Sequence, residues 1–163
     1  MNAPKRFQFL MPAPAVWVLA AAAGSTLLVA GAFLFQALGY APCKMCYWQR
    51  YPHWIAIIAG LCALGLGGRL FMVIGALATA TTGAIGVFHS GVEQKWWDGP
   101  SSCSGGSALT GLSGGDLLST DTIDKVVMCD EISWMFIGLS MPTWNAILSF
   151  VILGIWIKAL MQD

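Results

Sequence analysis

The stretch AVWVLAAAAGSTLLVAGAFLFQAL, residues 15–38, runs for 24 residues without a charged side chain. About 20 apolar residues in a helix cross the ~30 Å hydrocarbon core of a bilayer, so the stretch predicts a membrane-spanning helix. The basic residues Lys5 and Arg6 before it would also suit a secretory signal peptide. The apolar core of such a peptide has only about 7–15 residues, so a retained first helix is the better interpretation.

The composition of the whole chain agrees with a membrane protein. Hydrophobic residues make up 57% of the 163 residues and charged residues 10%, whereas soluble domains have about 25% charged residues. A soluble domain of this length could not cover so much apolar surface with a polar exterior. The length suits one domain. The net charge is zero and there is no basic run, which gives no reason to expect a nucleic-acid partner.

Three more apolar stretches follow residues 15–38. Residues 47–66 are the least regular of them, because Arg50 and His53 interrupt their first half. Gly67 and Gly68 predict a tight turn before the next stretch. The expected fold is an all-α membrane protein, a single domain with a bundle of four transmembrane helices and a long outer loop between the third and fourth helices. The expected spans are 15–38, 47–66, 70–89 and 144–160, and the expected outer loops are 39–46 and 90–143.

The third stretch and the long loop carry further local signals. Glycines at 75, 83 and 86 would allow a neighbouring helix to approach closely. Residues 90–143 hold most of the acidic residues and two Gly/Ser clusters, which are typical of a loop. Within it, Thr120 could cap a short helix with Ile123, Val126 and Val127 on one face.

Four spans place both termini on one side of the membrane. The basic residues divide four against four between the two sides, namely Lys5, Arg6, Arg69 and Lys158 against Lys44, Arg50, Lys95 and Lys125. The first helix often dominates the orientation, and basic residues precede it. We therefore expect cytoplasmic termini and outer loops in an oxidising compartment, where disulfides persist.

Five cysteines stand at positions 43, 46, 62, 103 and 129. Their spacing suggests two pairs and a remaining Cys62, which lies in an apolar run and is interpreted as a small buried apolar residue. The sequence leaves the pairing open. Cys43 and Cys46 form a Cys-x-x-Cys motif at the entry to the second predicted helix, within the stretch PCKMCYWQR, residues 42–50.

A Cys-x-x-Cys motif is compatible with redox chemistry or with half of a zinc site. Arg50 lies four residues after Cys46 and shares its helix face, where a guanidinium favours the reactive thiolate or could hold an anionic electron acceptor. The alternative for Arg50 is an interfacial anchor. Zinc would need a second ligand pair, and because Cys103 and Cys129 are 26 positions apart, their loop would have to fold onto the first pair.

The chain resembles the bacterial disulfide bond formation protein B (DsbB) family over nearly its whole length. The resemblance rests on the four predicted helices, on the second outer loop with two more cysteines, and on two motifs. The motifs are Pro42-Cys43-x-x-Cys46-x-x-Gln49-Arg50 and Gly138-Leu139-Ser140-Met141-Pro142-x-Trp144. The resemblance implies a multi-pass oxidoreductase of the bacterial inner membrane that reoxidises a periplasmic DsbA-like thiol oxidase and passes the electrons to ubiquinone or menaquinone, sustaining disulfide bond formation.

The resemblance also implies roles for individual residues. Cys103, paired with Cys129, would exchange with the partner protein. Cys43 and Cys46 would form the second redox-active pair, with Cys46 next to the quinone, and Arg50 would lie against a quinone oxygen. No metal is expected.

His89 ends the third predicted helix on the outer side, where it could hydrogen-bond the quinone or shuttle a proton. The run His89-Ser-Gly-Val-Glu93 is similar to that of the family, although an interfacial histidine without chemistry is equally compatible with the pattern. Gln49 and Glu93 are weaker candidates.

Two other classes of protein remain as alternatives. A four-span scaffold would use the outer-loop cysteines as structural disulfides, but a bridge over a loop as short as Cys43–Cys46 closes little chain entropy. A metal-binding membrane protein would use the Cys-x-x-Cys motif together with His89.

Overall fold

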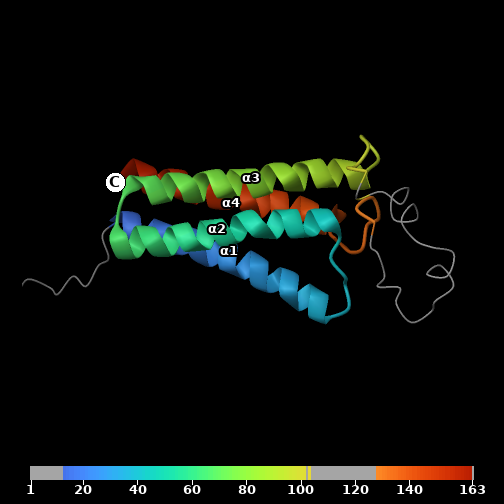
Figure 1. Ribbon diagram of the computed structural model, residues 1–163, viewed down its shortest axis with the longest axis horizontal. Helices are drawn as coiled ribbons and strands as arrows, with labels where there is room; N and C mark the ends of the chain where they lie inside the picture. Colours follow the sequence, from blue (N-terminus) through green and yellow to red (C-terminus); the bar gives the residue numbers. More distant parts are fainter. Residues whose placement is uncertain (1–12, 102, 104–127, 163) are drawn as a thin grey trace, which may run out of the picture.

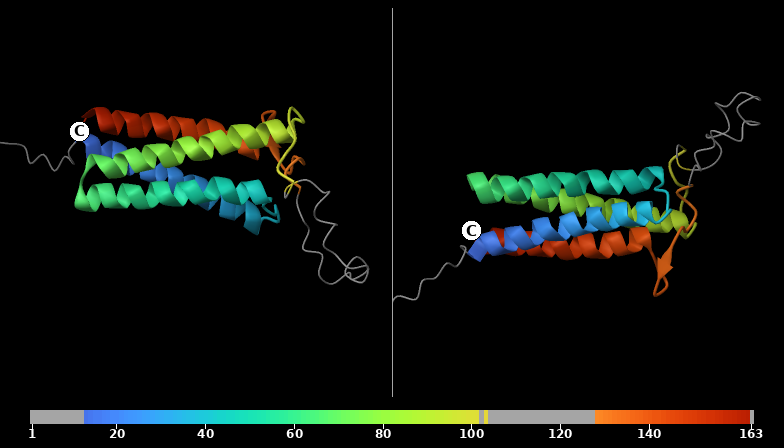
Figure 2. Two further views of the ribbon diagram at one scale, coloured as in Figure 1. Left: turned by 45° about the horizontal axis from the view of Figure 1, so that its top comes forward. Right: turned by 90° about the horizontal axis from the view of Figure 1, so that it is seen from below.

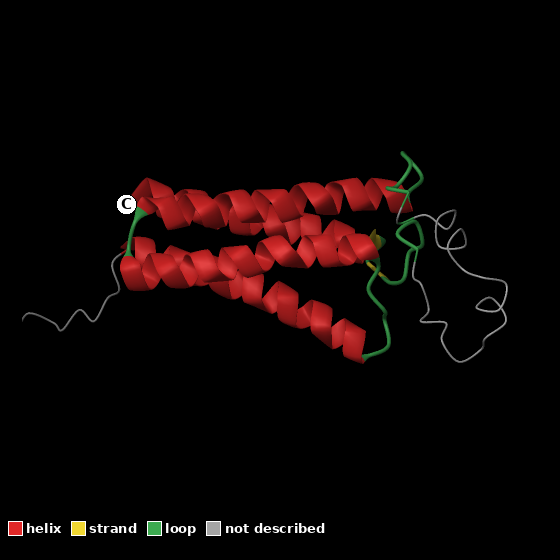
Figure 3. Ribbon diagram, in the orientation of Figure 1, coloured by secondary structure: helices red, strands yellow, loops and turns green. Residues whose placement is uncertain are grey.

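The computed structural model describes residues 13–101, 103 and 128–162. In this part of the chain, four long helices account for most of the structure. They are α1 (Ala13–Ala37), α2 (Lys44–Leu66), α3 (Arg69–Glu93) and α4 (Met141–Gln162). A hairpin of two short strands, β1 (Met135–Phe136) and β2 (Leu139–Ser140), directly precedes α4 (Figure 3). The basic lead at Lys5 and Arg6 and the short helix predicted from Thr120 lie outside the described residues.

The helices form an up-and-down bundle (Figure 1). α2 and α4 each contact both α1 and α3, so α1 and α3 occupy opposite corners. The turn between α2 and α3 lies at one end of the bundle, together with the C-terminal end of α4. The segments that follow α1 and α3 lie at the opposite end (Figures 1 and 2). Toward that end α1 slants away from its neighbours.

The four helices cover the four predicted ranges, with differences at the loop end. α3 continues to Glu93 rather than ending at His89, and α4 begins at Met141 rather than at Trp144. Both extensions shorten the segment predicted as the loop 90–143. Gly67 and Gly68 form the predicted turn, each with a positive φ, of 72° and 106°, which glycine adopts without a steric cost.

The hairpin departs from the all-α prediction. Its two central residues, Ile137 and Gly138, have φ angles of 53° and 76°, and positive φ at both positions is the pattern of a type I′ turn. Glycine suits this turn, but a β-branched residue with positive φ is a conformational outlier. The sequence therefore lacks the Asn-Gly or Asp-Gly signal from which such a hairpin is normally predicted.

Large apolar side chains cover the outside of the bundle, and several small polar ones are buried inside it. Exposed apolar residues occur on every helix, including Leu27, Leu61, Leu77 and Val151. Ser25, Thr79, Thr82 and Ser149, in contrast, are fully buried. This distribution is the reverse of that in a soluble bundle. It is typical of a bundle that is surrounded by lipid and whose helices pack closely inside.

Among the described residues, three helices are long and apolar enough to cross a membrane, namely Pro14–Ala37, Arg69–Glu93 and Met141–Gln162. α2 is not among them. It has 23 residues, but its first half carries the buried polar side chains of Gln49, Arg50 and His53.

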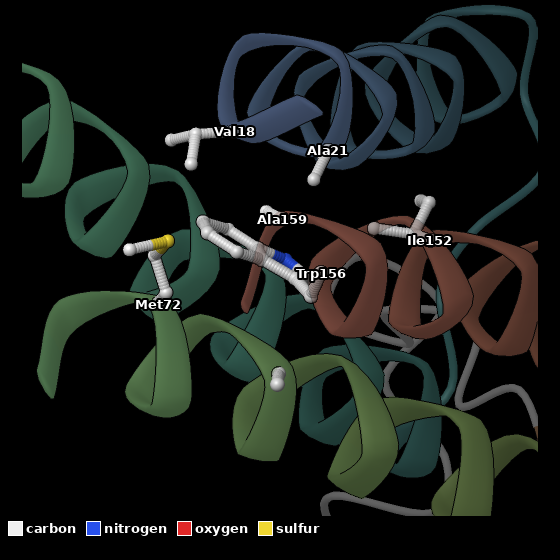
Figure 4. Packing of buried hydrophobic residues seen from close by; sticks show 7 residues of the cluster. Val18, Ala21, Met72, Ile152, Trp156 and Ala159 are labelled. Carbon is white, nitrogen blue, oxygen red and sulfur yellow. The ribbon is translucent and has the colours of Figure 1, made fainter. Parts of the chain in front are cut away.

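The apolar core lies at the end of the bundle that holds the α2–α3 turn, and the fully buried ring of Trp156 is its centre (Figure 4). Val18, Ala21 and Met72 surround this ring from α1 and α3. A Cβ atom on Gly75 would lie 2.5 Å from the Trp156 ring, so only glycine leaves room for it.

Gly83 and Gly86 of α3 also face α4. A Cβ atom on Gly83 would lie 3.0 Å from Phe150, and one on Gly86 would lie 3.0 Å from Ala146. The close helix approach predicted from these glycines is therefore confirmed.

We expect the substitution Gly75→Ala to destabilise the bundle by about 1–3 kcal/mol, the usual cost of overpacking a filled core. The added methyl group would force the Trp156 indole out of its position. Thermal unfolding in detergent, followed by near-UV circular dichroism of the tryptophans, measures the effect. Gly154→Ala is the matched control, because nothing lies within 4 Å of the added methyl group there. Equal stability of the two variants would contradict this account of the core.

Candidate active site

Cys43 is the N-cap of α2. Its backbone is extended, with φ −77° and ψ 172°, and its sulfur accepts a hydrogen bond from the backbone N–H of Cys46 at 3.2 Å. The first N–H groups of a helix have no partner within the helix, so this sulfur takes the place of the usual serine or aspartate oxygen. Both residues are free thiols, with 2.8 Å between their sulfurs. The motif thus lies on the first turn of α2, which begins at Lys44 rather than at the predicted residue 47.

The two thiols differ in environment. The hydrogen bond with Cys46, together with burial, raises the pKa of the Cys43 thiol. Cys43 is 4% exposed, whereas Cys46 is only partly buried. Cys43 therefore holds its proton while Cys46 is the more accessible sulfur and the better placed to react as a thiolate.

His89 lies against the same sulfur from α3. Its Nε2 atom is 3.5 Å from Cys43 Sγ and its Nδ1 atom is 2.7 Å from the side-chain nitrogen of Gln49. The hydroxyl group of Thr82 on α3 donates to the backbone carbonyl of Gln49 on α2 at 2.9 Å, which connects the two helices below His89. The structure thus brings the candidate His89 to the motif. It also gives the weaker candidate Gln49 a defined contact, since Gln49 orients the imidazole.

Cys103 and Cys129 form a disulfide, with 5.2 Å between their Cα atoms. This bridge is buried together with Cys43 and Met45, and Cys46 packs against the same cluster. The backbone of Cys129 is also a neighbour of the His89 ring. The fold therefore places the two cysteine pairs in contact, although they are far apart in the sequence.

The segment after Cys129 is held to the end of α3 by an ion pair between Asp130 and Lys95. The hydrogen bond from Lys95 lowers the pKa of the Asp130 carboxyl group. Both side chains reach solvent, so the pair contributes little to stability, on the order of 0–1 kcal/mol. It contributes instead to the position of the disulfide next to α3.

Arg50 points from α2 toward α1. Its guanidinium donates to Gln36 Oε1 at 2.9 Å and to the carbonyl oxygen of Ala32 at 3.2 Å. It also lies over the rings of Phe33 and Tyr47, 5.1 and 5.3 Å from their centroids. The guanidinium is therefore held in one orientation rather than extending freely to lipid headgroups.

A cavity of about 370 Å³ connects these groups. Cys43, Cys46, Arg50 and His89 all line it, at the end of the bundle where α1 slants away (Figure 1). Its aromatic lining residues come from α1, the loop after it, the hairpin segment and α4, namely Phe35, Tyr40, Trp134, Phe136 and Trp144. Volume and lining are typical of a site for a small, largely apolar ligand with a few polar contacts.

Sequence reasoning missed His53, a buried polar residue of this cavity, and gave another, Glu93, only as a weaker candidate. Glu93 is 8% exposed, and its Oε2 atom has no hydrogen-bond partner among the described residues. His53 is 2% exposed and lines the cavity together with Asn145. The available signal was the spacing of Gln49 and His53, which places them one turn apart on the same face of an otherwise apolar helix.

Cys43, Cys46 and His89 also meet a geometric condition for metal binding, since their donor atoms all lie within 4.8 Å of one another. Two sulfurs and an imidazole are suitable ligands for zinc. Cys62 lies on the same helix α2, is partly buried and does not line the cavity.

Fold and site together define a helical membrane protein with two adjoining cysteine pairs. Residues 14–159 match the family model described as "Disulfide bond formation protein DsbB". The chain therefore belongs to the DsbB disulfide bond formation family, and the resemblance noted in the sequence is confirmed.

Several curated relatives carry the name "Disulfide bond formation protein B". The protein from Verminephrobacter eiseniae is 30% identical over 142 residues, which cover 83% of this chain and 78% of the relative. The protein from Xanthomonas campestris pv. campestris is 32% identical, covering 80% of this chain and 79% of the relative. The protein from Albidiferax ferrireducens is 27% identical, covering 94% and 83%. No solved structure matches the chain at a comparable level of significance.

We expect iodoacetamide to modify Cys46 before Cys43 at neutral pH. The raised pKa and burial of Cys43 both slow its reaction, because the thiolate is the nucleophile. Peptide mass spectrometry of the briefly alkylated protein measures the order, in a Cys62→Ala background that removes the third free thiol. Preferential labelling of Cys43 would contradict the assignment.

Proposed function

We propose that this protein is a thiol:quinone oxidoreductase that reoxidises a periplasmic DsbA-like dithiol oxidase and passes the electrons to ubiquinone or menaquinone. The observation that carries the proposal is the contact between the Cys103–Cys129 disulfide and the Cys43–Cys46 motif. Two cysteine pairs in contact allow disulfide exchange between them. The family name supports the disulfide-forming activity.

The outer pair, Cys103 and Cys129, reacts with the partner protein. A thiolate of the partner attacks the sulfur of Cys103, which forms a mixed disulfide and releases Cys129 as a thiolate. The second thiolate of the partner then attacks its own sulfur in the mixed disulfide. The partner leaves with a disulfide, and Cys103 and Cys129 remain as two thiols.

The inner pair, Cys43 and Cys46, then receives the electrons by the same kind of disulfide exchange. Cys103 and Cys129 regain their disulfide while the Cys43–Cys46 disulfide is reduced to two thiols. His89 Nε2, 3.5 Å from Cys43 Sγ, is placed to transfer a proton to this sulfur when it leaves as a thiolate. The N-terminus of α2 stabilises negative charge on the same pair.

The cavity fits a quinone ring. Apolar and aromatic side chains form most of its wall, Arg50 supplies a fixed cation, and the buried Glu93 carboxyl has an oxygen without a partner among the described residues. When bound, a quinone supplies the acceptor for two electrons and two protons, which converts the Cys43–Cys46 dithiol to a disulfide. Arg50 would orient the ring beside Cys46, and the aromatic residues would exclude water.

The proposal includes the arrangement in the membrane. α2 would be a fourth span, because it packs between α1 and α3, two of the three membrane-capable helices, and exposes apolar residues such as Ile58 and Leu61. The cysteine end of the bundle would face the periplasm of a bacterial inner membrane and the termini would face the cytoplasm. This orientation puts Cys103 on the side of the membrane where the partner is, and it keeps the cavity within reach of a lipid-soluble quinone.

We expect Cys46→Ser and Cys103→Ser to abolish turnover by different routes. The assay mixes the purified protein with a reduced DsbA-like protein and a soluble quinone and follows quinone absorbance. With dithiothreitol in place of the partner, Cys103→Ser should retain quinone reduction, because a small dithiol reaches the inner pair directly, whereas Cys46→Ser should not. Cys62→Ala is the control and should match the unmodified protein. Turnover by Cys46→Ser would refute the proposed function.

Arg50→Ala should raise the apparent KM for quinone about tenfold or more, the value of a lost hydrogen bond to a charged group. The KM for the reduced partner should change little. Arg50→Lys is the matched variant. It keeps the charge but loses the two-pronged guanidinium that donates to Gln36 and to Ala32 at the same time. An unchanged quinone KM in Arg50→Ala would refute the role of this residue.

A second candidate function is metal binding at Cys43, Cys46 and His89, which the proximity of their donor atoms favours. Elemental analysis of the protein purified without chelator separates the two. One zinc per chain that is lost in His89→Ala, in a protein that shows no turnover with quinone, would favour the metal site over the oxidoreductase.

A further inference from the structure

A chain of hydrogen bonds crosses the interior of the bundle beneath the cysteine motif. Thr82 on α3 donates to the carbonyl oxygen of Gln49 at 2.9 Å. Asn145 on α4 donates from Nδ2 to Thr82 Oγ1 at 3.2 Å. Asn145 Oδ1 lies 3.1 Å from His53 Nε2 on α2. The chain therefore connects three helices and ends at the His53 ring.

The directions of these hydrogen bonds determine which nitrogen of His53 carries the ring proton. A carbonyl oxygen only accepts, so the single hydroxyl proton of Thr82 is directed to Gln49. Thr82 Oγ1 must then accept from Asn145, which requires the amide nitrogen on that side and the amide oxygen toward His53. Because that oxygen also only accepts, His53 Nε2 carries the ring proton. In the neutral imidazole, Nδ1 is consequently a bare acceptor.

This bare acceptor has no partner in the described part of the chain. His53 is 2% exposed and Nδ1 is a buried atom without a hydrogen bond. Burying a polar atom without a partner is unfavourable, and more so in lipid, where no water compensates. The Ser149 hydroxyl, 3.4 Å away, lies at Nε2 rather than at Nδ1.

His53 and Asn145 both line the cavity, together with Arg50 and Cys46. Arg50 and His53 are three residues apart on α2 and therefore share a face one turn apart. A flat ring with two opposite oxygens, held at Arg50 by one of them, would direct the other toward a neighbouring turn. His53 thus lines the same cavity as Arg50, one turn further along α2.

We infer that His53, held by Asn145, is a second hydrogen-bonding group for the ring ligand and accepts the O–H of the reduced, hydroquinone form. This inference rests on the proposed function. An acceptor without a proton binds an O–H group but offers nothing to a quinone carbonyl. The pair therefore favours the reduced ring over the oxidised one. Asn145 is a positioning residue, because it acts by keeping the ring proton on Nε2.

The test is equilibrium binding of decylubiquinol and decylubiquinone to the full-length protein in detergent, measured by tryptophan fluorescence quenching. His53→Leu should weaken decylubiquinol binding about five- to tenfold, the value of one neutral hydrogen bond, with decylubiquinone binding changed less than twofold. Cys62→Ala, a substitution on the same helix outside the cavity, is the matched control.

Asn145→Leu provides a second readout that a structural role would not produce. Without the amide oxygen, the ring proton can move to Nδ1, which then donates to a quinone carbonyl. The ratio of decylubiquinol to decylubiquinone affinity should fall in this variant because decylubiquinone binding improves. Thermal unfolding and the intact Cys103–Cys129 disulfide verify the fold of each variant.

The outcomes separate the inference from the proposed function. If the wild-type protein binds both ring forms and His53→Leu weakens binding of both equally or of neither, the role of His53 is overturned. The oxidoreductase proposal then still stands. Unmodified protein that binds neither form would overturn both.

Discussion

The hydrogen bond from the backbone N–H of Cys46 to the sulfur of Cys43 is the interaction on which the site depends. It starts α2 at this point, and the start of the helix determines which way Cys46, Gln49 and Arg50 point on the turns that follow. The same sulfur contacts His89 of α3 and the buried disulfide. One atom thus serves as helix cap, as redox group and as the meeting point of three segments.

The second constraint is the low polarity of the surroundings. Polar groups inside a lipid-covered bundle must find partners within the protein, and several of them do so through Thr82, Asn145, Gln49 and Ser149. Four buried side-chain atoms among the described residues lack a partner, and two of these belong to the cavity-lining residues His53 and Glu93. Unpaired buried polar atoms are costly, and a ligand in the cavity would supply partners for these two.

Much of the fold could be predicted from local patterns. The apolar stretches predicted the four helices, because a run of about 20 apolar residues is stable only where its surface is not in water. Gly75, Gly83 and Gly86 indicated close packing, and each faces a side chain of α4. The hairpin at Ile137 and Gly138 could not be predicted, because its turn conformation is imposed on an isoleucine that does not favour it.

The sequence by itself determined the helical membrane class and the location of the Cys-x-x-Cys motif on the first turn of α2, because both follow from short-range periodicity and composition. Only the tertiary structure decided which distant groups meet. The Cys103–Cys129 disulfide lies on the first pair, Gln49 orients His89, and Asn145 orients His53. These contacts join positions 40 to 92 residues apart, and no local pattern encodes them. They arise from the order in which the helices pack, which places α2 between α1 and α3 and α4 against both.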